Sequence, residues 1–355
     1  MSRFLSKKLS ALQAYTPGEQ PQDKKYIKLN TNEFPYPPAP DVVESVNADG
    51  MRALRLYPDP TGAQLKSKLA EVYGVGSENV FISNGSDDIL NFSFMAFCEN
   101  GAAYADITYG FYPVFAELYG VDSKIIPLKE DFTLDVEEFC RTDATCVIAN
   151  PNAPTGLAIS LADVERIVSA NENRVVVVDE AYVDFGGESA VKLTKKYKNL
   201  LVCMTYSKSR GMAGARLGFA IGDAALISDL ELIKYSTNPY NLDRLTLAAG
   251  SAALTDSSRS YYAKMQSELM ETRERTTAAL RALGAEVIPS LANFIFVKIP
   301  SIEGAQLNAA LRERGILVRH FKSERIKDYN RISIGTPDEM DALVCEIEKI
   351  IGDIK

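Results

Sequence analysis

Two apolar runs in this chain of 355 residues end next to side chains that could do chemistry. Four consecutive valines, Val175 to Val178, are followed directly by Asp179. Such a run predicts a parallel strand buried on both faces, with Asp179 at the carboxyl end, where open α/β sheets bind ligands. The run Leu200 to Met204 leads in the same way to Lys208. A lysine held among apolar neighbours can act as a nucleophile that forms Schiff bases.

Two further runs open into loops that suit a ligand. Cys146 to Ala149 leads into the loop 150–156, NPNAPTG, and Val80 to Ile82 leads into a loop that contains Gly85 and Ser86. A predicted helix, Ile89 to Phe97, follows that second loop. The free N–H groups and the dipole of a helix start favour a phosphate.

Each of these features also has an ordinary structural explanation. An isolated aspartate such as Asp179 is most often a solvated turn residue, and Gly-Ser-Asp before an apolar stretch is most often a plain N-cap. A lone Ser-Lys pair such as Ser207-Lys208 is most often surface. The four features together, in this order along the chain, favour a common site.

These stretches also carry a resemblance to a known family. The chain resembles the fold-type I pyridoxal-phosphate aminotransferases, and within them the histidinol-phosphate aminotransferases. The matching stretches span residues 28–336 and read KLNTNEFPYPPAP, LYPDPTG, SNGSDDIL, TYGFYPVFAELYGV, NPNAPTG, VVVVDEAYVDF, TYSKSRGMAGARLGF and RISIGT. The fold expected from the resemblance is α/β, with a large, mostly parallel sheet and a smaller α+β domain.

The resemblance implies a role for each group around the cofactor, pyridoxal 5′-phosphate. Lys208 would bind the cofactor covalently and move a proton between the substrate and the cofactor, so that no separate base is needed. Asp179 would pair with the pyridine nitrogen, and Tyr182 would bond the ring hydroxyl oxygen. Tyr109 would stack on the ring, a place that the neighbouring Phe111 or Tyr112 could also fill. The phosphate would be held by the backbone of Gly85, Ser86 and Asp87, by the hydroxyls of Thr205 and Ser207, and by Arg216.

The resemblance also implies a homodimer and shows two departures. Tyr57 resembles a tyrosine that reaches the phosphate of the neighbouring subunit's cofactor. The family usually has Asn directly before Pro-Thr-Gly, where this chain has Ala153, and we expect Asn152 to take over the contact with the ring hydroxyl. Phe34 replaces a common Asn in the segment TNEFPYP.

The expected substrates are L-histidinol phosphate and 2-oxoglutarate. Arg331 and Arg319 match the family's two C-terminal arginines and would bind the substrate's anionic groups, although a surface position at a strand edge explains Arg319 equally well. Tyr15 and Asn30 belong to an N-terminal arm that would close over the substrate. The alternatives are an aromatic amino acid aminotransferase, a threonine-phosphate decarboxylase of the same family, or a non-catalytic binding protein.

Composition and charge exclude several other classes. The net charge of −8 and the pI near 5.0 argue against partners such as nucleic acid or an anionic membrane. A single histidine, His320, rules out a multi-histidine metal centre, and no metal site is expected. No apolar leader or membrane span is evident, so we expect a cytoplasmic protein.

Strand and helix signals alternate through the first two thirds of the chain, which predicts βαβ units. A long helical stretch, 260–283, then precedes the strands predicted at 294–297 and 332–334. We therefore expect an irregular N-terminal arm, a large cofactor-binding domain and a small C-terminal domain, at 1–39, 40–240 and 241–355.

Overall fold

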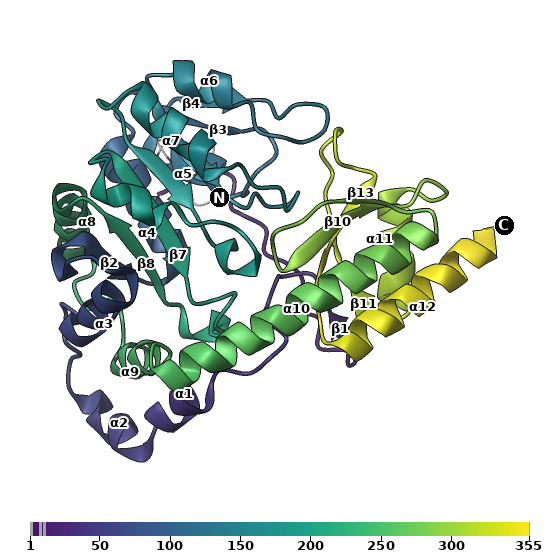
Figure 1. The fold of residues 1–355 in the computed structure, drawn as a ribbon, viewed down its shortest axis with the longest axis horizontal. Coiled ribbons are helices and arrows are strands. Elements are labelled where there is room, and N and C mark those ends of the chain that lie inside the picture. Colours follow the sequence, from purple (N-terminus) through teal and green to yellow (C-terminus); the bar gives the residue numbers. More distant parts are fainter. Residues whose placement is uncertain (1–2, 7–8, 10–11, 355) are drawn as a thin grey trace.

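The structure, a computed structural model, describes residues 3–6, 9 and 12–354. It contains two units, each built on its own sheet, and the long helix α10 (Asp256–Ala282) runs from one to the other (Figure 1). The N-terminal segment also passes between them (Figure 1).

The larger unit is built on a mostly parallel sheet, as predicted. Across the described chain this sheet has seven strands in the order β2-β8-β7-β6-β5-β3-β4. Only β8 runs antiparallel to its neighbours. The sequence predicted four of the strands and missed β3, β4 and β8. The strand bounds are β2 (Val80–Ser83), β3 (Ala102–Ala105), β4 (Ser123–Ile126), β5 (Thr145–Ala149), β6 (Val176–Asp179), β7 (Leu200–Thr205) and β8 (Gly218–Gly222).

Helices cover both faces of this sheet because its strands are apolar on both sides. Val176 and Val178 pack against one set of helices, while Val177 belongs to the cluster on the opposite face. The first face is covered by α3 (Ala63–Tyr73), α6 (Val136–Arg141), α7 (Leu161–Ala170) and α9 (Arg244–Ala252). The second is covered by α4 (Gly85–Phe97), α5 (Tyr112–Tyr119) and α8 (Ala224–Thr237). Two short helices, α1 (Pro40–Ser45) and α2 (Ala48–Arg52), precede them.

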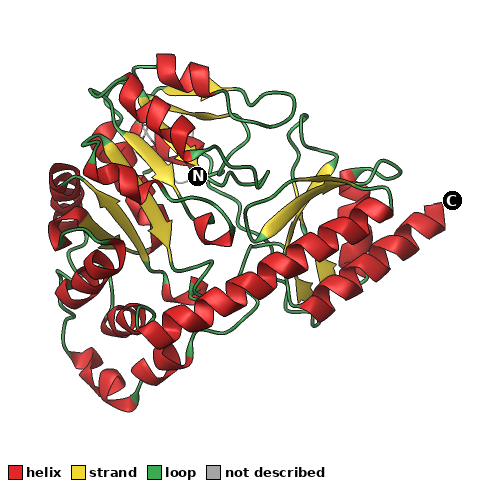
Figure 2. Ribbon diagram, in the orientation of Figure 1, coloured by secondary structure: helices red, strands yellow, loops and turns green. Residues whose placement is uncertain are grey.

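The smaller unit is a four-stranded antiparallel sheet in the order β12-β13-β10-β9, covered by α10, α11 and α12 (Figure 2). Its remaining elements are β9 (Glu286–Ile288), β10 (Phe294–Lys298), α11 (Gly304–Glu313), β12 (Arg319–His320), β13 (Tyr329–Ser333) and α12 (Pro337–Ile354).

The N-terminal segment is more ordered than the sequence indicated. Residues 1–39 were expected to be irregular, but β1 (Ile27–Lys28) pairs in parallel with β11 (Ile316–Leu317). Leu29 and Phe34 are buried in the core of the smaller unit. The irregular conformation expected for residues 1–39 is therefore wrong at 27–28, where the chain pairs with β11, while the N-terminal arm itself stays a prediction.

The boundary expected at residue 240 stays a prediction. Helix α9 lies beside α1 and α3, and Ala249 and Tyr262 belong to the core of the larger unit. The chain thus crosses to the smaller unit along α10 itself. Within the described ranges, no helix combines the length and the apolar character that crossing a membrane requires.

Candidate active site

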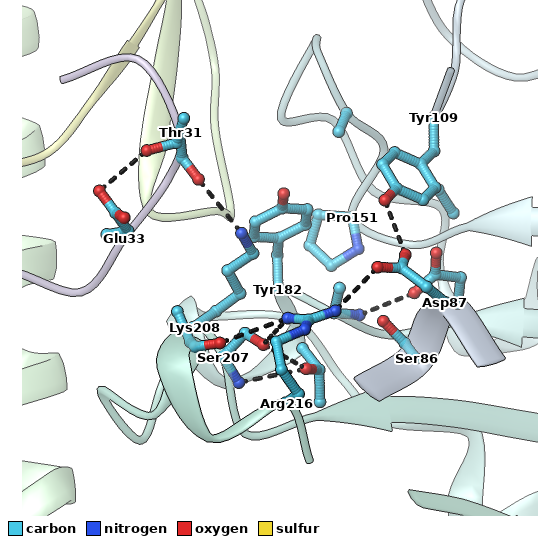
Figure 3. Close-up of a pocket in the computed structure, with 16 residues that line it drawn as sticks. Thr31, Glu33, Ser86, Asp87, Tyr109, Pro151, Tyr182, Ser207, Lys208 and Arg216 are labelled. Carbon is cyan, nitrogen blue, oxygen red and sulfur yellow. Dashed lines mark hydrogen bonds and ion pairs between the residues drawn. The ribbon is translucent and has the colours of Figure 1, made fainter. Parts of the chain in front are cut away.

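The register of the large sheet brings its polar strand ends together. Asp179 lies level with Ala149 on one side and with Cys203 on the other. Thr205 lies level with Gly218, which in turn faces Ser83. A cavity opens at this edge of the sheet (Figure 3). Nine of the residues that the sequence predicted line it: Ser86, Asp87, Tyr109, Asp179, Tyr182, Thr205, Ser207, Lys208 and Arg216.

Asp179 is a carboxylate buried without a cationic partner. It is 5% exposed, and no ion pair to it is formed by any residue that the structure describes. The Tyr112 hydroxyl donates to its Oδ2 at 2.9 Å, and the Ala181 N–H donates to its Oδ1 at 3.2 Å. Burial nevertheless raises the pKa of Asp179 to about 6, because these two bonds offset only part of the lost hydration.

Lys208 projects into the cavity from the loop that follows β7 (Figure 3). Its amine donates to the backbone oxygen of Thr31 at 3.2 Å and lies 5.7 Å from the ring centre of Tyr182. The amine therefore lies where the N-terminal segment meets the large sheet, with a neutral oxygen as its hydrogen-bond acceptor.

The opposite end of the cavity is a cradle for an anion. Helix α4 begins at Gly85, and the Asn84 side chain makes no capping bond to it. Gly85 has φ +76°, and a Cβ there would lie 2.8 Å from the Arg216 guanidinium. A Cβ on Gly218 would lie 2.4 Å from the backbone of Gly85, so only glycine lets β8 approach this helix start.

Hydroxyl groups and a guanidinium complete the cradle. Arg216 donates to Asp87 Oδ2 at 3.0 Å and to Ser207 Oγ at 3.4 Å. Thr205 Oγ1 lies 3.0 Å from the same serine oxygen, and Tyr109 donates to Asp87 Oδ1 at 2.7 Å (Figure 3). A bound phosphate could take the place of the Asp87 carboxylate as the partner of Arg216.

A second pocket adjoins the first and shares Tyr109 and Ala153 with it. It holds Arg319 and Arg331, and neither forms an ion pair with any carboxylate in the described part of the chain. Arg331 donates to the Asn30 backbone oxygen at 3.1 Å, its Nε is buried without a partner, and burial lowers its pKa. The pocket therefore presents unneutralised positive charge.

The N-terminal segment forms one wall of this second pocket. Tyr15 lines it and stacks on Phe111 with ring centres 4.3 Å apart. Arg319 donates to the backbone oxygens of Thr16 and Pro17 at 3.2 and 3.3 Å. The backbone oxygen of Asn30 accepts from Arg331. The Asn30 side-chain Oδ1 is buried and has no hydrogen-bond partner among the described residues.

Two residues predicted to contact the cofactor line neither the cavity nor its anion cradle. The Asn152 amide donates to Ile107 O and to Thr155 Oγ1, at 3.0 and 3.1 Å, and its oxygen accepts from Thr108. Asn152 faces a neighbouring pocket, while Ala153 lines the cavity. Tyr57 is 78% exposed on the surface. Their contacts with the cofactor stay predictions.

Three residues make contacts in the site that were not predicted from the sequence. Tyr112 was considered only for stacking, yet it bonds Asp179. Thr31 accepts from Lys208, and the Asn32 amide donates to Tyr182. The only available signal was that Thr31 and Asn32 lie inside a motif shared with the family.

Comparison with known proteins agrees with this arrangement. Residues 24–347 match the family described as "Aminotransferase class I and II". A histidinol-phosphate aminotransferase of Brachyspira hyodysenteriae is 49% identical over 99% of both chains. One of Clostridium acetobutylicum is 48% identical over 99% of this chain and 100% of that protein. The chain belongs to the class I and II aminotransferases, and within them to the histidinol-phosphate aminotransferases.

The fold of this aminotransferase is also found among solved structures. A histidinol-phosphate aminotransferase of Sinorhizobium meliloti, in complex with pyridoxal 5′-phosphate, has a TM-score of 0.87 at 23% identity and covers all of this chain and 99% of that one. This likeness confirms the fold-type I architecture that the sequence predicted.

The pKa of Asp179 gives a test of stability in the aminotransferase without cofactor. Below about pH 3.8 the carboxylate is protonated in both the folded and the unfolded chain. Between about pH 3.8 and 6 only the unfolded chain ionises it, so the folded protein loses stability across this range, and above about pH 6 the loss is complete. We expect Asp179→Asn to remove this loss, which amounts to about 3 kcal/mol at pH 8. Thermal unfolding midpoints should then be higher for the variant at pH 8 and similar at pH 4.

The exposed Asp229 supplies the control, because Asp229→Asn removes the same charge from the surface of α8. A midpoint that Asp179→Asn leaves unchanged at pH 8 would contradict the proposed cost of the buried charge.

Proposed function

We propose that the protein transfers an amino group between L-histidinol phosphate and 2-oxoglutarate, with pyridoxal 5′-phosphate as cofactor. One observation carries the proposal: a lysine amine, a buried carboxylate without a cation and an anion cradle line the same cavity. The relatives named above, at 48 and 49% identity, support the choice of substrate.

The residues present fit this cofactor. Asp179 has no cationic partner among the described residues, and the protonated pyridine nitrogen of the cofactor would supply one. The start of α4, Ser207 and Arg216 offer donors to a phosphate, and helix starts and guanidinium groups are well suited to that ligand. When bound, the cofactor supplies an electron sink for the electron pair released at the substrate α-carbon.

The chain's own groups bind, orient and move a proton. Lys208 would hold the cofactor covalently, and its amine, once released by the substrate amine, would move the proton at the substrate α-carbon. The Thr31 oxygen gives the free amine an acceptor at 3.2 Å, which keeps it in the cavity between these steps. The carboxylate of Asp179 holds positive charge at the ring nitrogen, and the ring of Tyr109 supports one face of the cofactor.

Arg319 and Arg331 suit the two substrates in turn. Histidinol phosphate has one strong anion, its phosphate, and 2-oxoglutarate has two carboxylates, so one cationic pocket can bind both. Arg331 has a buried Nε without a partner, which a phosphate or carboxylate oxygen would satisfy. We propose that Arg331 binds the phosphate of histidinol phosphate or the α-carboxylate of glutamate, with Arg319 at the other anionic end.

The activity is tested by single-turnover loss of the cofactor's visible absorbance after mixing with candidate amino donors. We expect fast loss with histidinol phosphate and glutamate, and slow loss with phenylalanine and threonine phosphate. Arg331→Gln should slow both fast reactions by about 10- to 100-fold, because each loses a charged hydrogen bond. Lys208→Ala should show no turnover.

Two outcomes would assign the protein a different activity of the same family. Faster reaction with phenylalanine would make it an aromatic amino acid aminotransferase. Release of carbon dioxide from threonine phosphate would make it a decarboxylase.

We also infer a homodimer in which Tyr57 reaches the partner's cofactor. Tyr57 stacks on Tyr240 with ring centres 4.5 Å apart, although both rings are exposed. Met51, Leu54 and Leu56 beside it are each about half exposed. A monomer gains nothing from exposing so much apolar surface in one place, whereas a second subunit would bury it.

The dimer predicts a specific effect of removing one hydroxyl. Tyr57→Phe should raise the dissociation constant for pyridoxal 5′-phosphate by about 10-fold or more, because a phosphate loses one hydrogen bond, while sedimentation still shows a dimer. Tyr26→Phe, in which the lost hydroxyl donates only to Asp23, is the matched control. A monomer that holds the cofactor as tightly as the wild type would refute the role of Tyr57.

A further inference from the structure

Asn32 joins the small domain to the cavity through a buried chain of hydrogen bonds. Its backbone N–H donates to Ser333 Oγ at 2.8 Å, and the Ser333 hydroxyl donates back to Asn32 Oδ1 at 2.9 Å. The Asn32 Nδ2 donates to the Tyr182 hydroxyl oxygen at 3.0 Å. Asn32 and Ser333 are 1% and 2% exposed, so water does not compete for these bonds.

The directions of these bonds follow from the number of protons available. The Asn32 backbone N–H can only donate, so Ser333 Oγ accepts from it. The Ser333 hydroxyl has one proton, which it donates to the nearest acceptor. The atom of the Asn32 side-chain amide that faces Ser333 is therefore Oδ1 and not Nδ2. The other end of the amide, Nδ2, must therefore face Tyr182 as a donor.

The backbone of Asn32 is also held in place for this contact. Its φ is +56°, in the left-handed region that asparagine tolerates better than most residues. The Asn293 amide donates to its backbone oxygen at 2.9 Å, so both sides of the residue are fixed by the small domain. The amide consequently has one orientation in the folded protein.

This orientation decides what Tyr182 can do. A phenol oxygen that accepts from Asn32 still has its own proton to donate, and the cavity is the open direction. The other tyrosine of the lining, Tyr109, already donates to Asp87. The wall formed by Pro151 and Ala153 offers no polar side-chain atom. Tyr182 is therefore the tyrosine of this cavity whose hydroxyl proton is left for a ligand.

We propose that Asn32, oriented by Ser333, is a positioning residue that fixes the Tyr182 hydroxyl as a hydrogen-bond donor to the ring oxygen of the cofactor. This inference rests on the proposed function, because it needs a cofactor with such an oxygen. A hydrogen bond donated to that ring oxygen stabilises the anionic form of the oxygen. A stabilised anion attracts the proton on the neighbouring nitrogen less strongly, and this nitrogen is the one that joins Lys208 to the cofactor. Asn32 and Tyr182 together therefore lower the pKa of that nitrogen.

The test is a pH titration of the visible absorbance of the cofactor-loaded protein. In Asn32→Asp, a carboxylate faces Tyr182 and accepts the hydrogen bond of its hydroxyl, so the ring oxygen loses its donor. We expect the pKa of the absorbance change to rise by about one to two units, the equivalent of one hydrogen bond to a charged group. Asn308→Asp adds the same charge at an amide that donates only to Val318 O, and it should leave the titration unchanged.

A double-mutant cycle separates positioning from the effect of the added charge. If Asn32 acts through Tyr182, the rise caused by Asn32→Asp should shrink by about one unit in a Tyr182→Phe background, where only the charge effect remains. An equal rise in both backgrounds, or no rise in either, would overturn the proposal.

Two further measurements distinguish a variant that fails to fold, and a protein without the cofactor, from a failure of the proposal. If Asn32→Asp does not fold or bind the cofactor, Ser333→Ala repeats the test without a charge: the amide can then turn its oxygen to Tyr182, and a smaller rise should appear only when Tyr182 is present. No rise would overturn the proposal. A wild-type protein without a reducible visible band would instead refute the cofactor, which is a failure of the proposed function.

Discussion

A carboxylate buried at the end of a parallel strand is the constraint around which this site is arranged. The valines that precede Asp179 place it at the sheet edge and also remove it from water, so its ionised form is costly. Tyr112 and the Ala181 N–H recover part of that cost, but no described cation does. We propose that a cationic ring nitrogen of the cofactor resolves this imbalance.

The site also contains two positively charged side chains, Arg216 and Arg331, that suit an anion. Arg216 is paired with Asp87 across the anion cradle, while Arg331 donates to the Asn30 backbone oxygen, lies over the ring of Phe294 and forms no ion pair with a described carboxylate. We propose that a phosphate takes over from Asp87 as the partner of Arg216 and that an anionic substrate pairs with Arg331. The protein as a whole carries a net charge of −8, so these two positively charged positions are local exceptions.

The sequence predicted the elements with the strongest local signals. The valine run became β6, and the strand expected at 294–297 lies within β10. Strand β8 was missed because GFAIG is short and begins and ends with glycine, and its antiparallel direction depends on its neighbours. Family motifs located most of the cavity lining, since these residues lie close to strand ends.

Contacts between distant parts of the chain could not be predicted in this way. Asn32 lies 150 residues from Tyr182 and 301 from Ser333, so no local pattern links them. The three consecutive residues Asn30, Thr31 and Asn32 contact Arg331, Lys208 and Tyr182 respectively. An arm expected to be irregular is thus the segment that connects the pocket of Arg331 to the Lys208 amine.

The attachment of the cofactor to Lys208 is tested most directly by reducing the purified protein with borohydride and mapping the labelled peptide by mass spectrometry. We expect one pyridoxyl phosphate group per chain, on the peptide that contains Lys208. A label on another lysine, or no label in protein incubated with pyridoxal 5′-phosphate, would contradict it.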